Sequence, residues 1–325
     1  MARTRLYRNG VLEREGFPMA EISDVVDEPG TVVWLDLCSA DGENLFEVEE
    51  EFGLHALAIE DASHERQRPK LDHYATHMFL SAYAVALDSA TNELASSEIA
   101  IFLLPKALIT VRKDHTFDIE QVVSRWDNSD AELAKEGVGF LLYGVLDYIV
   151  DGHFAAVQDL DEKIDTLEDE LFDEGHDRIR DVQRKSFALR KNLLLLRRFV
   201  LPMREVVNGL MRRDLKVVSE PLMPYYQDVY DHVLRATEWT ESLRDMVSTI
   251  LETNLTIQGN RMNLIMKKVT SWAAIIAVPT AVTGFYGQNL PYPGNGSDWG
   301  FAASSGLIVL GGLLLYWVFR RKDWL

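Results

Sequence analysis

The stretch VTSWAAIIAVPTAVTGF, residues 269–285, contains no charged side chain. As a helix rising ~1.5 Å per residue it covers roughly 26 Å, close to the thickness of a bilayer's hydrocarbon core. A second uncharged run, FAASSGLIVLGGLLLYWVF over residues 301–319, is followed at once by Arg320, Arg321 and Lys322. We therefore predict that the chain ends in a hairpin of two membrane-spanning helices.

Basic residues flank both runs and predict the orientation of the hairpin. They lie before the first run and after the second, at Arg261, Lys267, Lys268, Arg320, Arg321 and Lys322, whereas the intervening loop YGQNLPYPGNGSDWG has none. By the positive-inside rule both termini face the cytoplasm. Two helices buried in a soluble core are the alternative, but Tyr316 and Trp317 near the end of the second run are typical of a membrane interface. We expect a multi-pass protein of the inner or plasma membrane.

One face of the first run is small or polar along its whole length. Steps of three and four residues along this face reach Asn263, Met266, Thr270, Ala273, Ala277, Thr280 and Gly284. Two interpretations stay open here: close helix packing, with threonines hydrogen-bonded to their own helix, or the wall of a pore. Two spans cannot enclose an aqueous path, so a pore requires a ring of copies, for which cyclic symmetry is expected.

The composition is acidic, and two acidic residues continue the small and polar face toward the N-terminus. The 325 residues include 33 Lys+Arg and 51 Asp+Glu, for a net charge of -18, which argues against binding to nucleic acid. Continued toward the N-terminus, the face passes Gly259 and Thr256 to Glu252 and Asp245. A ring of copies would place these carboxylates around an inner vestibule, which favours cations over anions. The single cysteine, Cys38, excludes a disulfide within the chain.

The residues before the membrane divide into two parts. Short β-branched or aromatic runs at 31–37, 78–87, 99–104 and 108–113 predict strands, and 43–52 and 55–62 predict helices. The predicted organisation is an α/β cytoplasmic domain over 1–138, long cytoplasmic helices over 139–262 that include the lower pore helix, and a transmembrane region over 263–325. Within that region we place a first span at about 266–286, an outer loop at 287–300, a second span at about 301–319 and a basic cytoplasmic tail at 320–325.

Opposite charge distinguishes the two helices predicted after the α/β domain. The helix over 140–174 is rich in acid, the one over 179–211 is basic, and antiparallel neighbours of this kind can pair. An acidic face of this kind most often faces solvent. From Tyr225 no proline interrupts the pattern before Pro279, so one helix of about fifty residues could run from the cytoplasm into the membrane.

The segment Tyr286-Gly287-Gln288-Asn289 resembles the Tyr-Gly-Met-Asn signature of CorA-type magnesium transporters. Further similar segments follow in the family's order along nearly the whole chain: Trp34-Leu35-Asp36-Leu37, Gln67-Arg68-Pro69-Lys70-Leu71, Asp228-Val229-Tyr230-Asp231-His232, Met262-Asn263-Leu264-Ile265-Met266-Lys267 and the basic ending at Arg320. The resemblance implies a homopentameric funnel in which five copies of the first span line the pore and the second span lies outside it.

The resemblance also implies roles for individual residues. Gly287 and Asn289 would form the outer ion site with Gln288 between them, Thr280 and Gly284 would add oxygen rings, Met266 a constriction and Asn263 a polar ring. Asp88 and Asp228 would bind regulatory intracellular Mg²⁺ between subunits. The chain departs from the family's pattern at Gln288, where the signature has Met, at Ala277, where a second constricting Met is common, and in an outer loop whose single acid is Asp298.

These observations predict a passive channel or transporter for divalent metal cations, most of all for Mg²⁺ uptake. No phosphate-binding loop motif is present, and no spacing of Ser, His and Asp indicates an enzyme. Two alternatives stay open. One is a transporter for Zn²⁺, or for Co²⁺ and Ni²⁺, on the same scaffold; against Zn²⁺, the pore face offers no His or Cys. The other is a membrane-anchored metal sensor that does not conduct.

Overall fold

The computed structural model describes residues 2–38, 42–64, 67–129, 131–171, 176–288, 291 and 293–325. The chain divides into two compact units, Met1–Ile250 and Leu251–Leu325. The first contains a sheet and long helices, and the second contains two apolar helical segments.

A seven-stranded mixed sheet forms the centre of the first unit. Its strand order is β2-β1-β3-β7-β6-β5-β4, and only the β3–β7 pair is parallel. The strands are β1 (Ala2–Arg8), β2 (Val11–Glu15), β3 (Thr31–Cys38), β4 (Lys70–His73), β5 (Met78–Leu87), β6 (Leu94–Leu103) and β7 (Ala107–Arg112). The four predicted strands are confirmed as β3, β5, β6 and β7. Sequence reasoning missed β1, β2 and β4, whose sequences are rich in charge.

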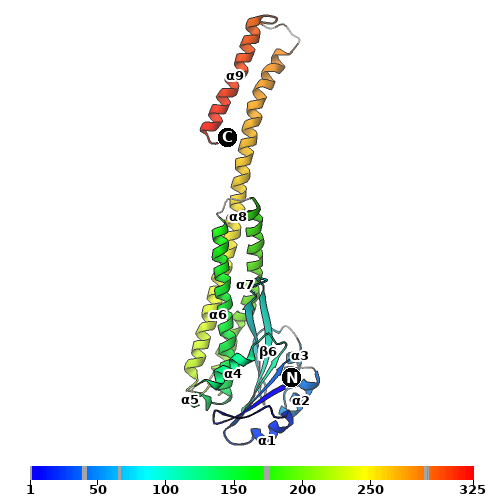
Figure 1. The fold of residues 1–325 in the computed structure, drawn as a ribbon, viewed down its shortest axis with the longest axis vertical. Coiled ribbons are helices and arrows are strands. Elements are labelled where there is room, and N and C mark those ends of the chain that lie inside the picture. The colour runs from blue at the N-terminus through cyan, green and yellow to red at the C-terminus, as the bar shows by residue number, and fades with distance from the viewer. Residues whose placement is uncertain are drawn as a thin grey trace. The chain divides into compact units, whose positions relative to one another are not determined.

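Helices cover both faces of this sheet (Figure 1). On one face lie the short helices η1 (Met19–Glu21), α1 (Ile22–Val26), α2 (Gly42–Phe52) and α3 (Ala56–Ser63). The other face packs against α4 (Ile119–Asp127), α6 (Val138–Leu171) and α7 (His176–Leu210), with α5 (Ala131–Ala134) before α6. Two separate apolar cores result, one on each side of the strands.

Three described helices are long and apolar enough to cross a membrane: α6, α8 (Met223–Tyr286) and α9 (Asp298–Arg321). Of the most apolar 18-residue stretch of each, 61% is buried in α6, 6% in α8 and none in α9. The apolar side chains of α6 therefore belong to the protein core, and the exposed stretches of α8 and α9 are the candidates for a bilayer. Ser297 caps α9, which begins three residues before the predicted start of the second span.

The lower part of α8 packs along one seam. Its buried residues recur at steps of three and four: Tyr226, Val229, Val233, Ala236, Thr240, Leu243, Val247 and Ile250. The Tyr226 hydroxyl donates to the Gly139 carbonyl of α6 at 2.9 Å, and Arg197 of α7 pairs with Glu241 of α8. Because a heptad spacing buries a single stripe, the opposite side of α8 stays exposed in the protomer.

His153 lies fully buried between α6 and the sheet, where its Nε2 donates to the Tyr83 carbonyl at 2.6 Å. Burial disfavours the charged ring and lowers the pKa of His153 from 6.5 to about 4. The unfolded chain thus binds a proton that the folded chain does not between these pH values. The stability that neutral His153 contributes is fully present above about pH 6.5. Below that pH it falls by ~1.4 kcal/mol per pH unit.

We expect acidification from pH 7 to pH 5 to cost about 2 kcal/mol of unfolding free energy through His153 alone. His153→Gln should weaken this pH dependence in chemical denaturation curves recorded at both pH values. His77, whose pKa is also lowered by burial, contributes in the same direction and remains in the variant. The exposed His64→Gln is the matched control, and equal slopes for the two variants would contradict the assignment to His153.

Candidate ion pathway

In the second unit α8 presents three different faces. The face toward α9 contains the fully buried Ser271 together with Val278 and Val282, which are less exposed than their neighbours. Gly311 of α9 allows this contact, because a Cβ at that position would lie only 2.9 Å from Val278 Cγ1. The small residue that brings the two helices close is therefore on α9.

The small and polar stripe lies on a second face. All its members are exposed: Asn263, Met266, Thr270, Ala273, Ala277, Thr280 and Gly284. At ~100° per residue, this face is turned by roughly 130° from the one that meets α9. A Cβ placed on Gly284 would meet nothing within 4 Å. Packing against α9 is therefore not what this stripe does in the protomer.

The third face is large and apolar. Ile265, Val269, Trp272 and Ile276 are 47 to 62% exposed and share one side of the helix. Such a face suits lipid chains, whereas the stripe offers small side chains and oxygen atoms. The segregation of the two exposed faces indicates two different surroundings.

The threonines of this segment bond to their own helix. Thr280 Oγ1 donates to the Ile276 carbonyl at 3.0 Å, and Thr283 Oγ1 donates to the Pro279 carbonyl at 2.8 Å. This part of the packing interpretation is confirmed. It does not exclude a pore, because a hydroxyl that donates its hydrogen keeps its oxygen lone pairs for a cation or water. Helix α8 continues through Pro279.

The outer end of α8 closes with short turns. The Gly287 N–H donates to the Thr283 carbonyl at 2.8 Å, and the Gln288 N–H donates to Phe285 O at 3.3 Å. A Cβ on Gly287 would approach the Thr283 oxygen to 2.8 Å, so glycine lets the backbone lie this close. Gly287 and Gln288 are both exposed. Asn289, the third residue predicted for the outer site, lies outside the described residues.

The stripe becomes acidic lower on α8. Asp245 and Glu252 are not on the buried seam; the Asp245 side chain is 77% exposed. Thr249 and Thr256, one turn beyond each acid, donate to the carbonyls of Asp245 and Glu252 at 3.1 and 3.0 Å. These carboxylates lie on the exposed side of α8, roughly opposite Val247.

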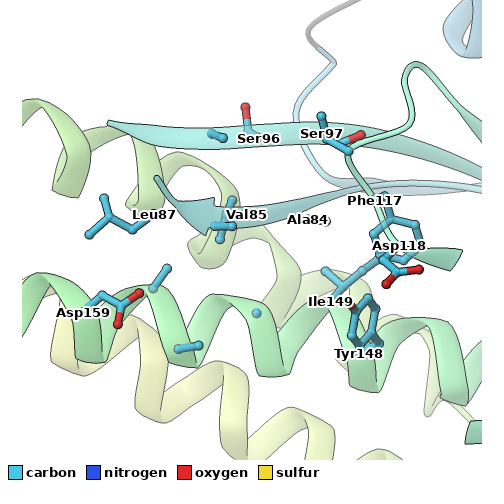
Figure 2. A pocket seen from close by; sticks show the side chains of 16 residues that line it. Ala84, Val85, Leu87, Ser96, Ser97, Phe117, Asp118, Tyr148, Ile149 and Asp159 are labelled. Atoms are coloured by element: carbon cyan, nitrogen blue, oxygen red, sulfur yellow. The ribbon is translucent and has the colours of Figure 1, made fainter. Parts of the chain in front are cut away.

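Asp88 stands at the tip of the β5–β6 hairpin. Its carboxylate accepts from the Ala90 N–H at 2.8 Å and from Thr91 Oγ1 at 2.9 Å, and these two hydrogen bonds lower the pKa of Asp88. The neighbouring Leu87 lies across a cavity of about 290 Å³ from Asp159 of α6 (Figure 2). The tip of the hairpin is thus level with the middle of α6.

Asp228 lies at a different level. Its Oδ2 is 3.5 Å from His232 Nδ1, and its charge acts on Asp147 of α6. Asp147 precedes Asp159 by twelve residues, or ~18 Å along a helix. One protomer therefore does not bring Asp88 and Asp228 together. Within the described residues no three His, Cys, Asp or Glu side chains are placed to hold a metal ion.

Sequence reasoning missed an acidic cluster beside Asp228. Arg125 of α4 pairs with Asp147 and, at 2.7 Å, with Asp151. Burial and the charge of Asp151 raise the pKa of Asp147, although Arg125 opposes them. The only signal in the sequence was a pair of acids four residues apart on an apolar helix. The counter-ion could not be found, because it comes from another helix.

Comparisons with known proteins agree with this architecture. The sequence model of the family described as "CorA-like Mg2+ transporter protein" matches residues 29–321. The cobalt/magnesium transport protein CorA of Thermotoga maritima is 27% identical over 92% of this chain and 85% of its own length. The putative metal ion transporter YfjQ of Bacillus subtilis is 31% identical over 90% and 89%.

More distant relatives include a zinc transporter. The zinc transport protein ZntB of Yersinia pseudotuberculosis is 24% identical over 80% of this chain and 78% of its own. Among solved structures, the CorA magnesium transporter from Methanocaldococcus jannaschii superposes with a TM-score of 0.82 at 22% identity, covering 100% of this chain and 99% of that one. The fold is therefore that of a full-length transporter of this kind.

Proposed function

The chain belongs to the CorA-like Mg²⁺ transporter family of divalent cation transporters, and we propose that it forms a homopentameric, passive channel for Mg²⁺ uptake. The observation that carries this proposal is the stripe on α8. It is exposed along its length, it is turned away from α9, and it is distinct from the large apolar face. In a cyclic ring such a stripe lines the axis, while the apolar face and α9 meet lipid.

Ions enter at the outer end, where Gly287, Gln288 and Asn289 hold the hydrated cation. Carbonyl and amide oxygens suit Mg²⁺, which keeps its octahedral water shell and dehydrates reluctantly. Further along the axis, Gly284 contributes a backbone carbonyl, Thr280 and Thr270 hydroxyl oxygens, and Met266 the narrowest apolar ring. Ala277, Ala273 and Asn263 complete the wall.

The inner acidic vestibule, Glu252 and Asp245, attracts cations at the cytoplasmic end. In this arrangement both termini lie in the cytoplasm of the inner or plasma membrane, and the chain crosses the bilayer twice. The membrane potential drives entry, because a divalent ion gains about 4.6 kcal/mol per 100 mV.

Gating follows from the positions of the two regulatory acids. Since one protomer does not bring Asp88 and Asp228 together, we propose that Mg²⁺ joins Asp88 of one subunit to Asp228 of another. Bound Mg²⁺ offsets the repulsion between the two carboxylates and favours the closed ring. When internal Mg²⁺ falls, the carboxylates repel each other and the ring opens.

The test is Mg²⁺ uptake into proteoliposomes that contain the full chain. We expect uptake when the inside is negative, and inhibition when Mg²⁺ is present on the side of the soluble unit. No uptake of any divalent ion at a potential of either sign would refute the channel and leave the non-conducting sensor.

A Zn²⁺ transporter is the second candidate, and the relationship to ZntB favours it. Gln288 is the residue to test, because its amide adds an oxygen and a nitrogen beside the outer site. If Gln288 favours Zn²⁺, Gln288→Met should lower the ratio of Zn²⁺ to Mg²⁺ uptake in the same vesicles. For a magnesium channel we expect Mg²⁺ to be preferred before and after the substitution.

A further inference from the structure

Helix α7 carries a cationic stripe on its exposed side. It consists of Arg180, Arg184, Phe187, Lys191, Leu194 and Arg198, at alternating steps of four and three residues. Phe187 is 54% exposed and Leu194 is 48% exposed, and they lie two helical turns apart on this side of α7. The ion pairs Arg184–Asp181 and Lys191–Glu93 join side chains that are all more than half exposed, so water screens them strongly.

Helix α6 carries the complementary acidic stripe. It consists of Asp151, Ala155, Gln158, Glu162, Asp165 and Asp169, with the same alternation of steps, and all six residues are exposed. Opposite charge on adjacent helices led us to expect that α6 and α7 neutralise each other. Lys185 and Glu170 do so at 2.6 Å, but the two stripes lie on other faces.

In the packed first unit, the cationic stripe of α7 and the acidic stripe of α6 face opposite directions. Helices α6 and α7 form a layer between the sheet and the lower part of α8 (Figure 1). On the sheet side, His153 of α6 and Phe199 of α7 both contact Tyr83, whose ring stacks on Phe199 at 4.2 Å. On the other side, Phe154 of α6 meets Trp239 of α8 at 5.4 Å between ring centroids. With both sides of the layer covered, the free faces point sideways.

The two stripes also lie at the same level. The Lys185–Glu170 pair and the cavity that Lys163 shares with Asn192 fix the offset between the antiparallel helices. Arg184, Lys191 and Arg198 are therefore level with Asp169, Asp165 and Gln158 to within about two residues, or ~3 Å.

We propose that the cationic stripe of one protomer packs against the acidic stripe of the next copy of this chain. The contact is heterologous, because two different surfaces meet, and repeating it by rotation about one axis closes a ring. Phe187 and Leu194 become buried at its centre, with the charged pairs around them. This inference rests on the ring of the proposed function and names the surfaces that build it.

Disulfide crosslinking of the full chain in membranes tests the contact. In a Cys38→Ser background, Lys191→Cys combined with Asp165→Cys should give a ladder of covalent species that ends at the complete ring. Either substitution alone should give monomers, because neither position meets its own copy in a heterologous contact. Lys191→Cys with Leu57→Cys, on the far side of the sheet, is the matched control. The absence of a ladder, or dimers from Lys191→Cys alone, would overturn the proposal.

Charge reversal supplies an independent measurement. Lys191→Glu with Arg198→Glu, or Glu162→Lys with Asp165→Lys, should shift the ring toward smaller species in detergent by about tenfold in concentration. The chain with all four changes should recover ring formation, because its stripes are again complementary. If the fourfold variant assembles no better than either pair, the inference fails. Uptake by the unaltered chain in proteoliposomes separates this failure from that of the channel itself.

Discussion

Ala277→Trp is expected to abolish divalent uptake, with a loss of roughly 100-fold or more. The small side chain of Ala277 lies on the exposed stripe of α8, where the proposed ring places one copy from each subunit around the axis. Several indoles at one level would obstruct the path that the proposed ring encloses. Uptake of Mg²⁺ into proteoliposomes at an inside-negative potential measures the effect.

Ile276→Trp is the matched control, because it changes the preceding residue on the same helix. Ile276 is 62% exposed on the large apolar face, which already holds Trp272. A tryptophan there meets lipid, so we expect uptake within about twofold of the unaltered chain. Equal loss of uptake in the two variants would show that the stripe does not line the path.

Asp36→Ala is expected to destabilise the first unit by about 3–5 kcal/mol. Asp36 is 2% exposed and accepts from Arg112 Nη2 at 2.5 Å, from Arg112 Nε at 3.0 Å and from Thr110 Oγ1 at 2.7 Å. Its removal leaves the buried guanidinium of Arg112 without this carboxylate. At ~2–4 °C per kcal/mol for a unit of this size, the midpoint of thermal unfolding should fall by about 10 °C.

Glu28→Ala provides the contrasting ion pair. Glu28 pairs with Arg8 at 2.5 Å, but both side chains are more than a third exposed. Exposed pairs contribute about 0–1 kcal/mol, so the midpoint should move by no more than a few degrees. If both variants unfolded at the same temperature, burial would not be what makes the Asp36–Arg112 pair important.

The strands that sequence reasoning found and missed differ in where their side chains lie. β3, β5, β6 and β7 are largely apolar runs, so composition reveals them. β1 alternates Arg3, Arg5 and Tyr7 on one face, and Arg5 is only 2% exposed and pairs with Asp127 at the end of α4. A buried arginine does not look like a core residue until its partner is known.

The candidate pathway was predictable to a greater extent, because its residues follow one another on one helix. Helical periodicity alone places the residues of the stripe from Asp245 to Gly284 on one face, and each described member is exposed in the protomer. The cluster of Arg125 with Asp147 was not predictable, since it joins two helices through tertiary packing. The same holds for the proposed pairing of Asp88 and Asp228, which no single protomer assembles.

By itself the sequence determined the two uncharged runs near the C-terminus and the small and polar stripe on the first of them. It also determined the acidic residues Glu252 and Asp245, which precede that stripe on the same helix face. These are local properties, carried by consecutive residues with a helical repeat. Only the tertiary structure decided which side chains of α6 the sheet, α7 and α8 bury. It also decided that the α8 stripe faces away from α9, and that the charged stripes of α6 and α7 point away from each other. The burial of a side chain and the direction of a helix face depend on which elements pack together. That packing is made of contacts between residues far apart in the chain.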